Sequence, residues 1–135
     1  MERQGPRTSR PVIVPQPERV RRLGSSGFGW IDARLHRDGW LEVMAPTELA
    51  LYAFLCLVAD RQGVSWYRRS RLSATMAVPH DELCFALRRL CELDLVAYRP
   101  FRQGAEDGFH QVLSLPAGGP TLSEEAGPVQ PLEWL

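Results

Sequence analysis

The sequence contains no lysine and no asparagine, and isoleucine occurs only twice. All sixteen basic residues are therefore arginine. This composition is typical of a GC-rich coding sequence, so the number of arginines alone does not predict a nucleic-acid-binding protein. Arginine is nevertheless a good reader of phosphates and bases where it is exposed, because its planar guanidinium donates paired hydrogen bonds. Only the position of an individual arginine is informative.

Cysteine is also scarce, and its three copies, Cys56, Cys84 and Cys91, all fall within apolar helical patterns. No CxxC pair occurs, so the spacing does not predict a zinc site. An odd number of cysteines without a secretory signal indicates reduced thiols in the cytoplasm. We therefore expect a cytoplasmic protein without a bound metal or cofactor.

Long hydrophobic runs are missing as well. The longest run, LALYAFLCLVA from Leu49 to Ala59, is too short for a transmembrane helix, which takes about 20 apolar residues. Arginine and proline interrupt the N-terminus throughout, so it does not resemble a cleavable signal. The sequence thus predicts a protein that makes no contact with a membrane.

Charge is balanced overall but unevenly placed along the chain. The formal net charge is zero, yet residues 1–37 hold eight arginines against three acids, and residues 100–135 hold one arginine against five acids. Residues 1–27 contain four prolines and six arginines and lack periodic apolar positions. This pattern predicts a disordered basic arm, which either folds along the phosphates of DNA on contact or has no such role.

The C-terminal stretch 117–135 is acidic and rich in proline and glycine, and it closes on Trp134 and Leu135. Its layout resembles the partner-docking tails of single-strand-binding proteins. Trp134 and Leu135 are therefore candidate docking residues on a disordered acidic tail; the alternative is a bare disordered terminus. Between the two ends, residues 28–116 have the apolar content of one folded domain.

Apolar periodicity divides this domain into helices and strands. FGWIDARL, which begins at Phe28, alternates like a short strand, and VSWY, which begins at Val64, is a second β-like run. Residues of about 47–60 form a helical pattern that is apolar on nearly every face. Such a helix is either central to a core or shared with a partner, so we also expect a homodimer.

A pair of helices joined by a tight turn is expected next. RRSRLSATM predicts the first helix, and Pro79 favours the start of a second helix over about 79–93, where Leu83, Leu87 and Leu90 form one apolar stripe. DLVAYRPF and FHQVLSLP then predict a β-hairpin. This order of elements is that of a winged helix, so the predicted fold is a single α+β winged helix-turn-helix domain.

Residues 45–116 resemble the winged helix-turn-helix proteins of bacteria. The matching stretches are SRLSATMAV for the first helix of the motif, ALRRLCELDLV for the end of the second, and YRP with FHQVLSLP for the wing. They are similar in particular to the N-terminal domains of plasmid and phage replication initiators and to small helix-turn-helix proteins encoded beside transposable elements. The resemblance implies a DNA-binding accessory or regulatory protein of a mobile element, serving replication, transposition or transcription control.

The start of the second helix departs from that family. Its base-reading positions read PHDELCF here, and the carboxylates of Asp81 and Glu82 stabilise a helix N-terminus but repel a phosphate backbone. His80 is a candidate DNA contact or an ordinary residue of the first helical turn. Phe85, on the outward stripe, is a candidate docking residue for a protein or for a thymine methyl group, unless another segment covers it.

Arginines elsewhere are better candidates for contact with DNA. Arg68, Arg69 and Arg71 begin the helix that crosses the DNA backbone in this family, and no acid lies near them in the sequence. We rank these three as the best phosphate contacts.

Further arginines are secondary candidates for contact with DNA. Arg88 lies within helical reach of Glu92, which could pair with it instead. Arg99 and Arg102 flank the wing, where phosphate contacts are common, but two acids in the same loop are competing partners.

The sequence shows no nucleophile–base pair, no carboxylate cluster and no glycine-rich phosphate loop, so we expect no enzyme. Two functions remain. The first is a protein that binds duplex DNA for a mobile element. The alternative is a winged-helix protein–protein interaction module, which docks a replication or transposition partner without reading DNA.

Overall fold

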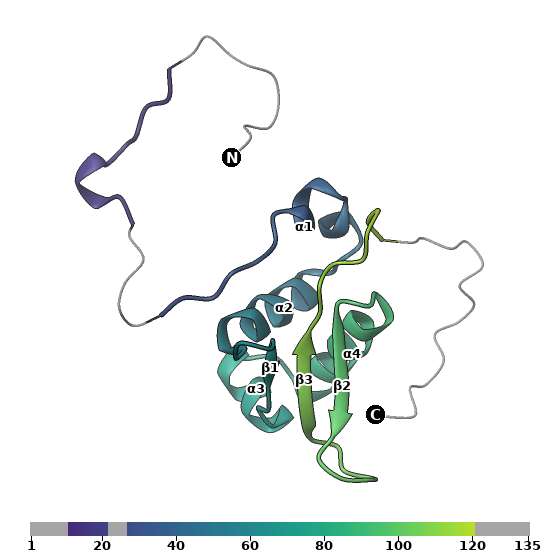
Figure 1. Ribbon diagram of the computed structural model, residues 1–135. Helices are drawn as coiled ribbons and strands as arrows, with labels where there is room; N and C mark the ends of the chain where they lie inside the picture. Colours follow the sequence, from purple (N-terminus) through teal and green to yellow (C-terminus); the bar gives the residue numbers. More distant parts are fainter. Residues whose placement is uncertain (1–10, 22–26, 121–135) are drawn as a thin grey trace.

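Helices make up the first part of the described chain, and a short strand, two further helices and a β-hairpin follow (Figure 1). The computed structural model describes residues 11–21 and 27–120. The chain has the predicted α+β class. In chain order the elements are the 3-10 helix η1 (Pro17–Arg19), α1 (Arg34–Arg37), the 3-10 helix η2 (Trp40–Glu42), α2 (Pro46–Val58), β1 (Val64–Ser65), α3 (Arg69–Met76), α4 (His80–Glu92), β2 (Val96–Pro100) and β3 (Gly108–Val112).

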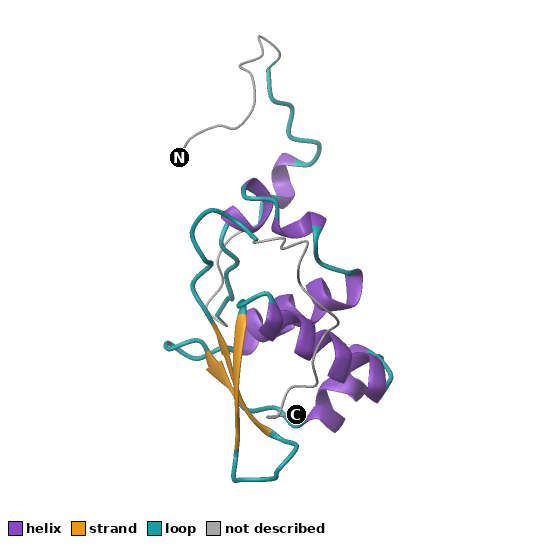
Figure 2. Cartoon of the chain, turned by 90° about the vertical axis from the view of Figure 1, so that its right-hand side faces the viewer, coloured by secondary structure: helices purple, strands orange, loops and turns teal. Residues whose placement is uncertain are grey.

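The three strands form one antiparallel sheet in the order β1-β3-β2. Strand β3 is central, because Gln111 pairs with Val64 of β1 on one side and with Ala97 of β2 on the other. The helices lie on one face of this sheet, as the side view in Figure 2 shows. On the other face, Phe109 and Gln111 of β3 are exposed.

The core lies between the sheet, α2 and α4. The predicted stripe of α4 is confirmed, since Leu83, Leu87 and Leu90 are fully buried. Burying one such leucine stabilises the fold by about 2 kcal/mol. The other buried apolar residues come from every part of the domain: Leu35, Trp40, Met44, Leu51, Tyr52, Leu55, Cys56, Leu72, Ala86, Leu95, Val96 and Leu115.

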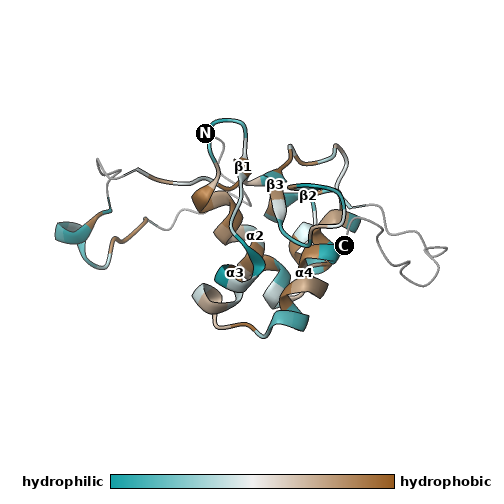
Figure 3. Ribbon diagram, turned by 90° about the horizontal axis from the view of Figure 1, so that it is seen from below, coloured by the Kyte–Doolittle hydropathy of each residue, from teal (hydrophilic) through white to brown (hydrophobic). Residues whose placement is uncertain are grey.

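Helix α2 is central to the core, as its apolar pattern predicts, and Figure 3 shows it hydrophobic along most of its length. Its first turn holds a buried carboxylate: Glu48 accepts a hydrogen bond from the Ala45 N–H at 3.0 Å and lies 3.7 Å from Arg89. The large apolar side chain that α2 leaves exposed is Leu57. The core therefore buries most of the apolar surface of α2, from which the homodimer was predicted. The homodimer stays a prediction.

The turn between α3 and α4 is as tight as the sequence predicts. Helix α3 ends at Met76, Ala77 adopts a left-handed conformation with φ of 55°, and α4 begins at His80. The Ser73 hydroxyl donates to the Val78 carbonyl, and the Val78 N–H donates to the Ser73 carbonyl at 3.1 Å. These paired bonds fix the direction in which α4 leaves the turn.

The strand predicted at Phe28 is wrong. Residues 27–32 form no strand, and the chain turns into α1 instead. The Asp32 carboxylate accepts a hydrogen bond from the Arg34 N–H at 2.9 Å, and its two oxygens accept from Nε and Nη2 of the Arg34 guanidinium. This local pairing satisfies the start of a helical turn, so it competes with extended backbone.

Several predictions concern segments that the structure does not describe. Residues 1–10, 22–26 and 121–135 lie outside the described residues. The predicted disordered arm falls partly on them, and Trp134 and Leu135 of the tail fall wholly on them. The docking role of these two residues therefore stays a prediction.

Within the described residues, no helix is long and apolar enough to cross a membrane.

Replacing Ala77 with glycine tests the strain in the α3–α4 turn. A left-handed conformation costs a non-glycine residue about 1–2 kcal/mol, and the greater freedom of glycine in the unfolded chain offsets part of the gain. We expect Ala77→Gly to raise the free energy of unfolding by about 0.5–1 kcal/mol in urea denaturation. The matched control is Ala74→Gly within α3, which should lower it by about 1 kcal/mol. Equal destabilisation by both variants would contradict the strained turn.

Candidate nucleic-acid interface

The loop between β2 and β3 lies against the first turns of both α3 and α4. Asp107 accepts a hydrogen bond from the Arg69 N–H at 2.9 Å, and its second carboxylate oxygen lies 3.8 Å from the Arg68 guanidinium. Glu106 lies 3.3 Å from the His80 imidazole at the start of α4. The two acids of the β2–β3 loop therefore pair with the helix starts, and in the described part of the chain neither forms an ion pair with Arg99 or Arg102.

Arg69 is buried beneath this loop, with only 2% of its surface exposed. Its guanidinium donates to the Cys84 sulfur at 3.3 Å and lies over the Tyr98 ring, 5.2 Å from the ring centre. A side chain in this position is not available to a DNA phosphate. The prediction that Arg69 is a surface contact is therefore corrected: Arg69 joins α3, α4 and β2.

Arg68 and Arg71 do lie at the surface. The Arg68 side chain is 71% exposed, so its distant pairing with Asp107 leaves it open to another partner. Arg71 is exposed and its guanidinium lies 5.1 Å from the centre of the Tyr67 ring, which it covers. Stacking on a ring holds the arginine in place while its N–H groups stay free to donate.

Arg99 and Arg102 are both exposed on the hairpin. Arg99 sits on β2 opposite Phe109 of β3. Neither arginine has an ion pair among the residues that the structure describes, so the competing partners considered for them do not neutralise them.

Helix α4 presents few cations at its outer side. Arg89 pairs with Glu92 at 2.9 Å and lies near Glu48, so this arginine is absorbed within the fold. Arg88 is half-buried, and His80 is exposed beside Glu106. Phe85 is exposed, as its place on the outward stripe predicts, and no described segment covers it fully.

An exposed row of aromatic rings crosses the open face of the sheet, and the sequence patterns did not reveal it. Trp66 follows β1, Phe109 lies on β3, and Phe101 follows β2. The centroids of Trp66 and Phe109 are 6.4 Å apart, and those of Phe109 and Phe101 are 5.0 Å apart. All three residues are exposed. The alternation of β3 would have placed Phe109 outward, but the row forms only once the three strands pair.

His110 is a buried titratable residue behind this row. It packs on Tyr98, and neither ring nitrogen has a hydrogen-bond partner among the described residues. Burial and, to a smaller extent, the nearby Arg69 cation lower the pKa of His110 to about 4, against an opposing effect of Asp107. The imidazole is therefore neutral at pH 7.

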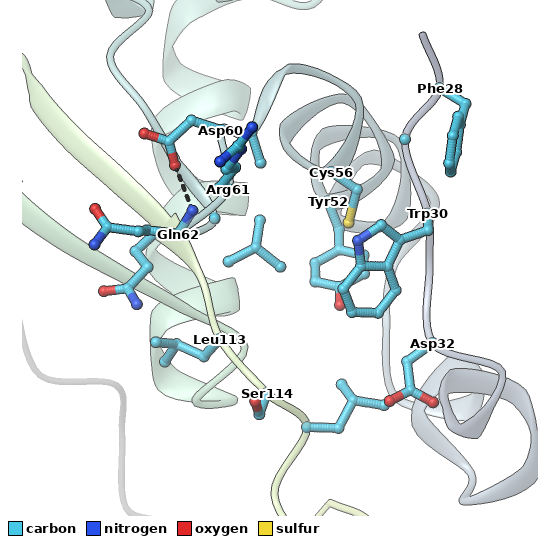
Figure 4. Close-up of a pocket in the computed structure, with 16 residues that line it drawn as sticks. Phe28, Trp30, Asp32, Tyr52, Cys56, Asp60, Arg61, Gln62, Leu113 and Ser114 are labelled. Atoms are coloured by element: carbon cyan, nitrogen blue, oxygen red, sulfur yellow. Dashed lines mark hydrogen bonds between the residues drawn. The ribbon is translucent and has the colours of Figure 1, made fainter.

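A hollow of about 770 Å³ lies at the other end of the sheet, between residues 28–32, the end of α2 and the end of β3 (Figure 4). Trp30, Tyr52 and Cys56 line one side. Burial raises the pKa of the Cys56 thiol and that of the Tyr52 hydroxyl. Both groups are thus held protonated, which is the reverse of what an activated nucleophile needs.

One group of described residues has the ligand types of a metal site: His80, Cys84 and Glu106, whose candidate ligand atoms all lie within 4.8 Å of one another. The sequence patterns did not predict a metal site. The spacing of His80 and Cys84, four residues apart on one helix, is the signal that could have indicated it. Glu106 could not be found in this way, because it comes from the hairpin loop.

No family model matches the chain, and no curated protein or solved structure matches it either.

His110 predicts a specific dependence of stability on pH. Its pKa falls from 6.5 in the unfolded chain to about 4 in the folded protein, so the unfolded state binds this proton more tightly. The contribution of His110 to the free energy of unfolding is fully present above pH 6.5 and is lost as the pH falls toward 4. We expect a loss of about 2–3 kcal/mol in the free energy of unfolding between pH 7 and pH 4.5 from this residue.

Urea denaturation of the wild type and of His110→Leu at both pH values measures this contribution. Leucine keeps the buried volume and cannot be protonated, so the variant should lose about 2–3 kcal/mol less than the wild type over the same interval. Parallel losses in the two proteins would show that His110 is not the buried titrating group.

Proposed function

We propose that the chain is a winged-helix protein that binds duplex DNA and is not an enzyme. The observation that carries the proposal is the arrangement of α2, β1, α3, α4 and the hairpin, with the sheet order β1-β3-β2 and a tight turn between α3 and α4. Two helices joined by such a turn are the helix-turn-helix unit, and the adjacent hairpin corresponds to the wing.

Exposed arginines on two neighbouring elements would supply the phosphate contacts. Arg68 and Arg71 lie at the start of α3, and Arg99 and Arg102 lie on the hairpin. The pairing of Asp107 with Arg68 shows that these two elements are adjacent in space. Guanidinium groups at both places could meet one DNA backbone, which favours binding through phosphates over base reading.

The charges at the start of α4 also favour phosphate contacts from α3 and the hairpin over base reading by α4. Asp81 and Glu82 lie in its first turn, and Glu106 of the loop lies beside His80. Three carboxylates at this helix N-terminus disfavour an approach of phosphate, which the helix dipole would otherwise attract. Contact through His80, and contact through the half-buried Arg88, are therefore the weaker part of the proposal.

The proposed role in a mobile element rests on the resemblance of residues 45–116 to replication initiators and transposon-associated proteins. A cytoplasmic location belongs to the same proposal. The fold arrangement supports the binding of DNA.

A mobility-shift titration with a short duplex at 50 and 200 mM salt tests the binding of DNA. Four phosphate contacts predict an affinity that falls about 100-fold over this range, because each contact releases bound counterions. Arg68→Ala with Arg71→Ala, or Arg99→Ala with Arg102→Ala, should weaken binding at low salt. Each double change should also reduce the slope of log affinity against log salt by about 2.

Arg61→Ala is the matched control, since Arg61 is exposed at the turn before β1, at the end of the sheet away from the hairpin loop. Its affinity should equal that of the wild type. No binding of the wild type at 50 mM salt, or an equal loss in the Arg61 variant, would overturn the proposal.

The exposed aromatic row favours a second candidate, the protein-interaction module. Trp66, Phe109 and Phe101 present contiguous apolar surface on the sheet, and Phe85 adds an exposed ring on α4. Large exposed aromatic residues are enriched at the energetic centres of protein interfaces. A partner of this kind could be a second copy of the chain.

Sedimentation equilibrium tests the homodimer and locates its surface. If the aromatic row carries the association, Trp66→Glu should give a monomer and Leu57→Glu should leave the dimer intact, because a carboxylate buried in an apolar contact is strongly destabilising. If the outer side of α2 carries the association, Leu57→Glu should give a monomer and Trp66→Glu should leave the dimer intact. A wild type that is monomeric at all concentrations would rule the homodimer out.

A further inference from the structure

His80, Cys84 and Glu106 form a cluster at the junction of α4 and the hairpin loop. The His80 imidazole Nε2 lies 3.4 Å from the Cys84 Sγ and 3.3 Å from the Glu106 Oε2. The three ligand atoms lie within 4.8 Å of one another. None of the phosphate contacts proposed for the α3 start or the hairpin arginines uses this group of side chains.

Two of the three separations, those from His80 to Cys84 and to Glu106, match the edges of a tetrahedral zinc site. Zinc binds imidazole nitrogen and carboxylate oxygen at about 2.0–2.1 Å and thiolate sulfur at about 2.3 Å. At tetrahedral angles, neighbouring nitrogen and oxygen ligands are then about 3.3 Å apart, and nitrogen and sulfur about 3.5 Å. The His80–Glu106 and His80–Cys84 distances reach these values without any movement of the backbone.

The backbone that carries the three ligands is fixed on both sides. His80 and Cys84 project from successive turns of α4, which holds them on one side of the helix. On the loop, the Tyr98 hydroxyl donates to the Glu106 carbonyl, and the next residue, Asp107, accepts the hydrogen bond that caps α3. The loop therefore presents Glu106 to α4 from an anchored position, which lowers the entropic cost of binding an ion.

The surroundings of the sulfur also suit a metal ligand. The buried Arg69 guanidinium donates a hydrogen bond to the Cys84 Sγ at 3.3 Å. Metal ligands are usually oriented by outer-shell hydrogen bonds of this kind. His80 and Glu106 are both about half exposed, so an ion can enter from solvent.

We propose that His80, Cys84 and Glu106 bind one zinc ion, with the fourth coordination position open to water or to a further ligand. An imidazole, a thiolate and a carboxylate form a mixed set that suits a borderline cation such as zinc better than magnesium or calcium, which take oxygen ligands. The bound ion neutralises the two negative charges of the thiolate and the carboxylate. It also ties the hairpin loop to the start of α4.

Cobalt substitution tests the site with a spectroscopic signal that requires the thiolate. The reduced full-length chain is titrated with Co²⁺ and then with Zn²⁺. We expect a sulfur-to-cobalt charge-transfer band in the near ultraviolet that saturates at one ion per chain and disappears when zinc displaces cobalt. Isothermal titration with Zn²⁺ alone should give the same stoichiometry.

Single substitutions assign the ligands. Cys84→Ser should abolish the charge-transfer band, and His80→Gln and Glu106→Gln should each weaken zinc affinity by more than about tenfold, since the loss of even an outer-shell partner costs about 10–100-fold. The exposed positions of His80 and Glu106 keep the fold intact, which thermal melts of the metal-free variants verify.

Cys91→Ser is the matched control, because Cys91 lies on the same helix two turns further on. Burial raises the pKa of the Cys91 thiol to about 12, so it is a poor metal ligand, and its variant should bind zinc as the wild type does. The proposal is overturned if the wild type shows no cobalt–thiolate band. It is equally overturned if the band persists in Cys84→Ser, or if Cys91→Ser removes it. Any of these outcomes would mean that the short distances among His80, Cys84 and Glu106 reflect hydrogen bonds alone.

Discussion

The burial of Arg69 is the constraint on which the arrangement of helices, sheet and loop depends. A buried cation is costly unless other groups interact with it. Here the partners of the guanidinium come from two elements, and a third element accepts the hydrogen bond of the Arg69 backbone N–H. The Cys84 sulfur of α4 accepts its hydrogen bond, the Tyr98 ring of β2 lies beneath it, and Asp107 of the loop caps its backbone N–H. The same cation helps to keep His110 neutral. Helix α3 is thereby joined to α4 and to the hairpin.

This junction determines which surfaces remain for function. Asp107 and Glu106 are used at the helix starts, so the acids that could have neutralised Arg99 and Arg102 do not reach them. Positive charge is consequently exposed on the hairpin and on the outer side of α3, and negative charge gathers at the start of α4. The open sheet face adds apolar rings beside the charges. Charge and apolar surface therefore lie next to each other around the hairpin.

Local patterns predicted the elements well and the site only in part. The leucine stripe of α4, the turn after Met76 and the hairpin depend on spacing within one segment, and all three were correctly predicted. The strand expected at Phe28 failed because the pairing of Asp32 with Arg34 outweighed an alternating pattern. The burial of Arg69 depends on Cys84 and Asp107, which lie 15 and 38 positions further along the sequence. No pattern within one segment contains that information, and the same holds for the aromatic row and for Glu106.

The most direct test of the account is a map of the DNA-binding surface by nuclear magnetic resonance. Amide chemical shifts of the full chain are followed while a short duplex is added at low salt. We predict the largest changes at residues 68–71 and 99–102, with smaller changes at residues 80–85 at the start of α4. Changes confined to the start of α4, or no changes anywhere, would contradict it.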